Sequence, residues 1–195
     1  MANVDNPSGF KVIGHLTDAP VSGCVHAYVV PASDGTALYL GDVVKSGGTM
    51  AVDSDGKYRP TVTRAAAGDT MRGIVVGFKS DYDNLDLKYR VANTLRTVFV
   101  ADDPYILCEA QEDGDTTPLA AVDMGENVDI IYTGTGSSVT GQSICELDST
   151  THTSSSAQFR LYDFKKPIKD DNEIGAWARW IVMPNEHELK STSGV

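Results

Sequence analysis

The chain has 195 residues, of which 41% are hydrophobic and 22% are charged. This length suits one domain and argues against two full ones, and the composition excludes a chain that is disordered throughout. No apolar run approaches the ~20 residues of a membrane-spanning helix, and the formal net charge of −11 argues against a nucleic-acid partner, because phosphate binding requires clustered cations.

Residues 1–10, MANVDNPSGF, are predicted to form an extended N-terminal arm. They show no hydrophobic periodicity, and a segment of Asn, Pro and Gly cannot bury enough apolar surface by itself. They also lack the basic start and apolar stretch of a secretory signal, so folding in the cytoplasm is expected. Asn3, Pro7 and Phe10 are therefore candidate contacts to a neighbouring chain, with Phe10 as the anchor.

Residues 11–189 are predicted to fold as a single β domain. Val, Ile and Thr occur in short runs that Gly and Pro interrupt, which is typical of strands and turns. Candidate strands cover Gly23–Val30, Thr36–Val44, Thr49–Val52, Met71–Phe78, Thr94–Val100, Tyr105–Gln111, Asn127–Tyr132, Ser143–Leu147, Ala157–Asp163 and Ala176–Met183. Their spacing favours an all-β antiparallel sandwich or barrel, with minor helical connections at Asp81–Leu87 and Pro118–Gly125.

The middle of the chain carries the whole net charge. Lys and Arg do not occur between Arg96 and Arg160, whereas eleven carboxylates do: Asp102, Asp103, Glu109, Glu112, Asp113, Asp115, Asp123, Glu126, Asp129, Glu146 and Asp148. Because burial of unpaired carboxylates is costly, we expect much of this charge at the surface. It serves either solvation and repulsion between particles or docking on a basic partner.

Two glycine-containing loops resemble ligand-binding motifs and are incomplete. Residues 136–143 have the glycine spacing of a phosphate-binding loop, but Gln142 stands where the lysine is needed. Asp53-Ser54-Asp55-Gly56 resembles the start of a calcium loop, but Lys57 and Arg64 occupy positions that require oxygen ligands. Both are predicted to be hairpin loops.

The cysteines and histidines show no metal-ligand spacing, and the three cysteines are expected to be buried and reduced. Cys24 and His26 would share one face of a strand, as a nucleophile and base do, but the sequence shows no third group to orient them. We therefore expect no catalytic residue, no metal and no cofactor, although a triad built from scattered residues cannot be seen in one sequence.

The chain ends with an aromatic strand and a tail. Alternation over Ala176–Met183 sends Trp177 and Trp180 to opposite faces, so that both faces carry a large apolar group. One of them packs in the core, and the other is a candidate subunit contact. Residues 190–195 are predicted to be a loose C-terminal tail.

Several short motifs occur in order along nearly the full length. They are Met1-Ala2-Asn3 through Phe10, His15-Leu16-Thr17, Gly41-Asp42-Val43-Val44, Arg72-Gly73-Ile74-Val75-Val76-Gly77, Asp171 through Trp180, and Asn185-Glu186-His187. Together they resemble small virion structural proteins of tailed bacteriophages, in particular head decoration (capsid cement) proteins.

The resemblance implies a mostly β protein that performs no chemistry. It would bind the outer surface of the assembled capsid as a homo-oligomer and bridge subunits of the major capsid protein. The expected partners are the major capsid protein and further copies of the chain, as a trimer in preference to a dimer, and the expected location is the virion after synthesis in the host cytoplasm. The alternatives are another virion component, such as a head-tail or tail protein, or a small β-barrel carbohydrate-binding module or enzyme.

Overall fold

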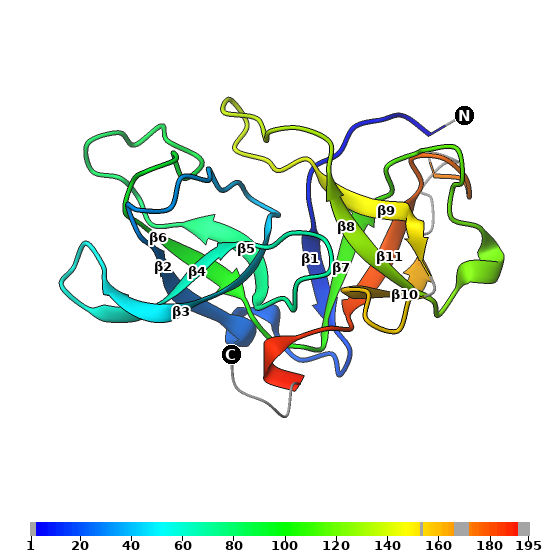
Figure 1. The fold of residues 1–195 in the computed structure, drawn as a ribbon, viewed down its shortest axis with the longest axis horizontal. Coiled ribbons are helices and arrows are strands. Elements are labelled where there is room, and N and C mark those ends of the chain that lie inside the picture. Colours follow the sequence, from blue (N-terminus) through cyan, green and yellow to red (C-terminus); the bar gives the residue numbers. More distant parts are fainter. Residues whose placement is uncertain (1–2, 153, 166–171, 191–195) are drawn as a thin grey trace.

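The computed structural model describes residues 3–152, 154–165 and 172–190 (Figure 1). Within these ranges the chain forms eleven strands and three short 3-10 helices. The strands are β1 Lys11–His15, β2 Val25–Val30, β3 Val43–Val52, β4 Tyr58–Arg64, β5 Gly73–Phe78, β6 Arg96–Ala101, β7 Ile106–Gln111, β8 Asn127–Tyr132, β9 Cys145–His152, β10 Phe159–Phe164 and β11 Arg179–Pro184; the helices are η1 Val21–Cys24, η2 Ala121–Asp123 and η3 Glu188–Lys190. The predicted all-β class is confirmed.

The strands form two sheets that lie next to each other (Figure 1). Strands β2 to β6 close into a barrel in the order β2-β4-β3-β5-β6, in which only the contact between β2 and β4 is parallel. The other strands form an open antiparallel sheet in the order β1-β7-β11-β10-β8-β9. Because β1 and β7 are neighbours in this sheet, the whole barrel is inserted between two adjacent strands.

Consecutive residues of three barrel strands are buried on opposite sides of the barrel wall. The inward members fill the barrel and the outward members join the cluster of the six-stranded sheet: Val44 and Val43 in β3, Val75 and Ile74 in β5, Val100 and Ala101 in β6. Successive strand residues point to opposite faces, so an uninterrupted apolar pair is what a wall between two cores requires. The barrel and the sheet therefore share a packed boundary.

Some elements differ from the sequence-based expectation. Strands β1 and β4 form where none is predicted. Strand β3 begins at Val43, so that only the last two residues of the expected strand Thr36–Val44 belong to a strand. Residues Asp81–Leu87 form turns rather than a helix, and η2 is the only helical part of Pro118–Gly125. Of the predicted tail 190–195, Lys190 belongs to η3 and residues 191–195 lie outside the described residues.

Candidate functional site

The N-terminal segment lies along its own chain, and a free arm is not confirmed. Asn3 donates from Nδ2 to the carbonyl oxygen of Ala176 at 2.9 Å. Gln111 in β7 accepts from the backbone N–H of Asn6 at 3.0 Å and donates to the carbonyl oxygen of Val4 at 2.8 Å. These polar contacts hold residues 3–6 against the six-stranded sheet.

Phe10 is a core residue, which corrects its assignment as a surface anchor. Its side chain is 2% exposed, and its ring stacks on that of Phe159 with the centroids 4.5 Å apart. Gly9 turns the chain into the core with φ +70, and a Cβ there would lie 2.7 Å from the Cβ of Ser143, so a side chain would not fit. Pro7, two residues before Gly9, is half-buried.

The two tryptophans do not lie on opposite faces of one strand. Trp177 belongs to the turn before β11, has φ +59, and is half-buried with its indole against Gly114. Trp180 in β11 is 0% exposed and packs edge-on against Phe164 at 5.0 Å. Trp180 therefore packs in the core, and the expectation that it contacts another subunit is wrong.

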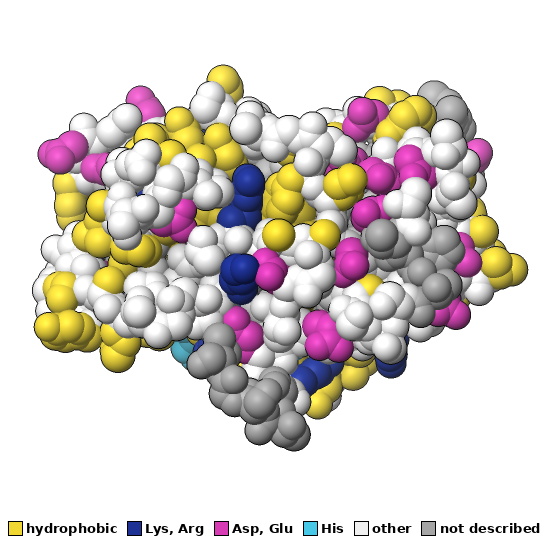
Figure 2. Space-filling model, viewed as in Figure 1, with side chains coloured by type: hydrophobic (Ala, Val, Ile, Leu, Met, Phe, Trp, Pro, Cys, Tyr) yellow, Lys and Arg dark blue, Asp and Glu magenta, His cyan; other side chains and the backbone are white. Residues whose placement is uncertain are grey.

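The acidic block of residues 97–159 exposes less charge than expected. Glu109, 8% exposed, has Lys165 Nζ at 2.8 Å. Glu112 and Glu146 are at most 2% exposed, and burial raises the pKa of each to about 7. Even so, Figure 2 shows Asp and Glu side chains gathered over the half of the visible face that the six-stranded sheet forms.

An exposed apolar face lies on the hairpin of β3 and β4. Met50 pairs with Pro60 and Val52 with Tyr58, so all four side chains point to the same side of the hairpin. Met50 is 62% exposed, Val52 40% and Tyr58 73%, and Pro60 is exposed as well. Figure 1 shows this cyan hairpin extending from the barrel away from the six-stranded sheet. We call these four side chains the hairpin face.

The tip of this hairpin is the calcium-like sequence, and the structure confirms that it is a turn. Asp53 accepts from the backbone N–H groups of Asp55 at 2.8 Å and Lys57 at 2.9 Å, and from Arg59 Nε at 2.6 Å. The hydrogen bond from Arg59, followed by the one from Lys57, lowers the pKa of Asp53 to about 2. The carboxylate oxygens thus hold the turn in shape.

A cleft of about 510 Å³ opens at one end of the barrel. Its wall includes Asp102, which is 5% exposed and accepts from the Tyr28 hydroxyl at 2.5 Å and from His26 Nδ1 at 2.7 Å. Arg72 Nη2 lies 3.7 Å from the same carboxylate. Burial and the bond to Asp102 raise the pKa of Tyr28 to about 12, so its hydroxyl remains protonated and donates.

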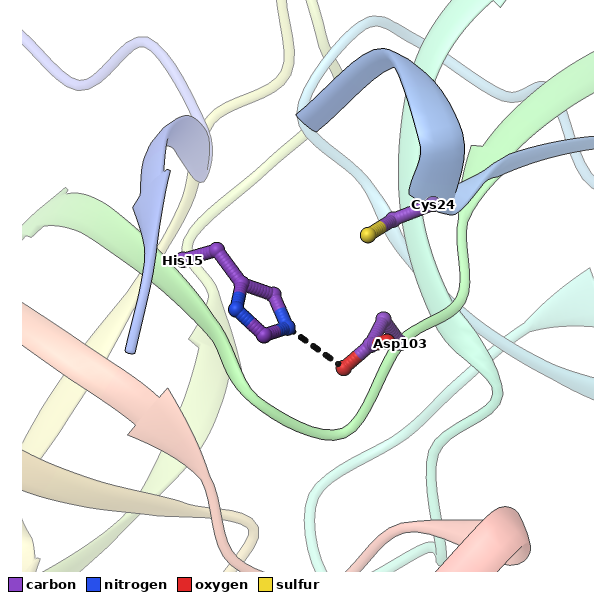
Figure 3. A group of neighbouring side chains, drawn as sticks. All are labelled: His15, Cys24 and Asp103. Carbon is purple, nitrogen blue, oxygen red and sulfur yellow. Dashed lines mark hydrogen bonds and ion pairs between the residues drawn. The ribbon is translucent and has the colours of Figure 1, made fainter. Parts of the chain in front are cut away.

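Three potential ligands converge beside this cleft, where the barrel meets the six-stranded sheet. His15 ends β1, Cys24 ends η1, and Asp103 follows β6. Figure 3 shows their side chains pointing toward one another, and their ligand atoms all lie within 4.8 Å of each other. His15 Nε2 is 3.1 Å from Asp103 Oδ1, and His15 Nδ1 is 2.9 Å from Thr17 Oγ1. His15 and Cys24 are buried, whereas Asp103 is half-buried.

The charge state of this cluster does not suit a cysteine nucleophile. Burial, followed by the charge of Asp103, raises the pKa of the Cys24 thiol, which disfavours the reactive thiolate. His26, which the sequence places beside Cys24, bonds Asp102 instead. The residues that do lie next to Cys24 come from distant parts of the chain, and no spacing in the sequence signals them.

Comparison of the chain with known protein families, curated proteins and solved structures found no match. Within the described ranges, every helical segment falls short of the length and apolar character needed to span a membrane.

Proposed function

We propose that this protein is a non-enzymatic virion structural protein that binds the outer surface of a tailed-bacteriophage capsid as a homo-oligomer and stabilises the shell by bridging major capsid protein subunits. The hairpin face is the observation that carries the proposal. It presents four apolar side chains on the two strands of a hairpin whose turn is held by Asp53, and exposed apolar surface of this kind is typical of protein-binding sites. The resemblance of the ordered motifs supplies the class of partner.

The two ends of the molecule differ in a way that supports one orientation. The hairpin face is apolar, whereas Asp and Glu gather over the six-stranded sheet (Figure 2). We place the hairpin face against the capsid and the acidic half toward solvent, where like charges keep neighbouring particles apart. Several weak hairpin contacts made at once by one oligomer would raise the avidity by ~100-fold or more.

The proposal is tested by adding purified protein to cognate particles that lack it. Wild-type protein should cover the shell and raise the temperature at which DNA is released, because a ligand of the assembled shell stabilises that state. Identical release profiles for decorated and bare particles would contradict the cement function. Binding only at the tail vertex would instead favour the head-tail or tail alternative.

The hairpin face has its own test in the double variant Met50→Ser/Tyr58→Ser. Both side chains are more than half exposed, so the fold should tolerate the change while occupancy at equal concentration falls at least tenfold. Val122→Ser is the matched control, because Val122 is 87% exposed in η2, which is not part of the hairpin. Undiminished occupancy of the double variant would exclude the hairpin face as the docking surface.

A further inference from the structure

We propose that His15, Cys24 and Asp103 form a zinc site at the junction of the barrel and the six-stranded sheet. This inference goes beyond the capsid-binding function and does not depend on it. The sequence gives no hint of such a site, because the three ligands come from three segments that only the folded topology brings together.

The spacing of the ligand atoms fits a small tetrahedral ion. Zinc bonds of ~2.0–2.3 Å to N, O and S place neighbouring ligand atoms roughly 3.2 to 3.7 Å apart in a tetrahedron. His15 Nε2 and Asp103 Oδ1 are already 3.1 Å apart, and Cys24 Sγ is within 4.8 Å of both ligands. Closing the site therefore requires side-chain movements of only about 1 Å.

The types of ligand decide which ion suits the site. A thiol and an imidazole favour borderline or soft transition metals, whereas calcium and magnesium require six or more oxygen ligands. Three protein ligands leave a fourth position for water, as in open zinc sites. Cys24 and Asp103 both line the 510 Å³ cleft, which gives an ion and its water a route to the cluster.

Neighbouring groups hold two of the ligands in place. Asp103 Oδ1 accepts from the backbone N–H of Tyr105 at 2.8 Å, which fixes the carboxylate. His15 Nδ1 faces Thr17 Oγ1 at 2.9 Å, so a proton on Nδ1 can be donated to this hydroxyl while Nε2 binds the metal. The backbone N–H of Thr17, which donates to Nδ1 at 3.2 Å, would then need another acceptor, and Thr17 is an exposed residue that water can reach.

Metal binding changes the protonation of two of the ligands. Without metal, Nε2–H of His15 donates to Asp103 and the Cys24 thiol keeps its proton. On binding, the imidazole proton moves to Nδ1 and the thiol proton leaves to solvent, while the sulfur and Nε2 bond the ion. One proton is therefore released for each ion that binds.

Cobalt(II) is the probe for the test, with the full chain freed of metal by a chelator. A stoichiometric titration should give the intense visible bands of tetrahedral cobalt and a near-ultraviolet thiolate charge-transfer band, and zinc should remove both. Cys24→Ser should abolish the charge-transfer band and weaken zinc binding at least 100-fold, and His15→Asn at least tenfold. Cys108→Ala, which removes a buried thiol elsewhere, should keep every band.

A second measurement does not depend on the variants. Zinc should slow the reaction of Cys24 with a thiol reagent and raise the unfolding temperature of the wild-type chain. Absence of the tetrahedral bands would overturn the proposal. A charge-transfer band that persists in Cys24→Ser, or bands that disappear in Cys108→Ala, would also overturn it, because they would place the ion at another site.

Discussion

Glu112 should make the stability of this protein fall as the pH rises. Its side chain is 0% exposed; Oε2 accepts from the backbone N–H of Leu119 at 2.8 Å, whereas Oε1 has no hydrogen-bond partner among the described residues. Burial, opposed by that hydrogen bond, raises the pKa from 4.5 to about 7. In the unfolded chain the carboxyl ionises near 4.5, so the folded state binds more protons between these two values.

The raised pKa of Glu112 sets how much the free energy of unfolding changes with pH. A group whose folded pKa is raised contributes fully below its unfolded pKa, and its contribution is lost as the pH rises through the folded pKa. The shift from 4.5 to about 7 corresponds to about 3 kcal/mol in total, of which about 2 to 3 kcal/mol falls between pH 5 and 8. Glu146, with the pKa raised to about 7 by burial, acts in the same direction.

The assay is urea unfolding at pH 5 and pH 8 for the wild type, Glu112→Gln and the exposed control Glu126→Gln. The buried amide of Glu112→Gln lowers stability equally at both pH values, so only the difference between the two pH values is compared. Wild type and Glu126→Gln should lose about 2 to 3 kcal/mol more than Glu112→Gln over this range. An equal loss of stability between pH 5 and pH 8 in all three proteins would show that burial does not raise the pKa of Glu112.

Two further predictions concern the packing. Phe10→Ala should lower the free energy of unfolding by about 3 to 5 kcal/mol, measured by urea unfolding, because it empties the space beside Phe159; Val4→Ala, at 73% exposed, should change it by less than ~0.5 kcal/mol, and similar small effects would restore Phe10 as a surface anchor. Arg90→Met should cost about 3 to 5 kcal/mol in the same assay, because Arg90 is 0% exposed and donates to the carbonyl oxygens of Pro31, Asp34, Thr36 and Thr94, which would lose their partner. The exposed Arg160→Met is the control, and equal effects of the two arginine variants would contradict this reasoning.

The sequence predicts most reliably the strands that are rich in aliphatic residues and largely buried. Gly73–Phe78 and Ile106–Gln111 are rich in aliphatic residues and come close to the expected bounds. The sequence does not predict strand β4, Tyr58–Arg64. This strand contains Pro60, which lacks an N–H and argues against a strand. The structure tolerates Pro60 because β2 pairs with β4 only at Thr61. On the side of β4 that faces β2, most residues therefore make no backbone hydrogen bonds to a neighbouring strand.

The sequence predicts the candidate sites only where local residues determine them, and the remaining contacts arise from the topology of the fold. The hairpin turn at Asp53 is visible in the sequence, because Asp and Gly at a turn have local causes. His15 and Asp103 are neighbours only because β1 pairs with β7, although the whole barrel lies between these strands in the sequence. A pairing between strands so far apart cannot be predicted from the local sequence. Strand alternation does not predict the position of Trp177, because this residue precedes β11 and lies in a turn with positive φ.

The insertion of the barrel between β1 and β7 also sets an order of events during synthesis. Strand β1 leaves the ribosome first, but its partner β7 is translated only after all five barrel strands are complete. Pairings between strands far apart in sequence form slowly, whereas β3 with β4 and β5 with β6 are consecutive in the chain. The hairpins of β3 with β4 and β5 with β6 can therefore form while β1 is still an unpaired edge, and this nascent edge is open to wrong pairing with another copy.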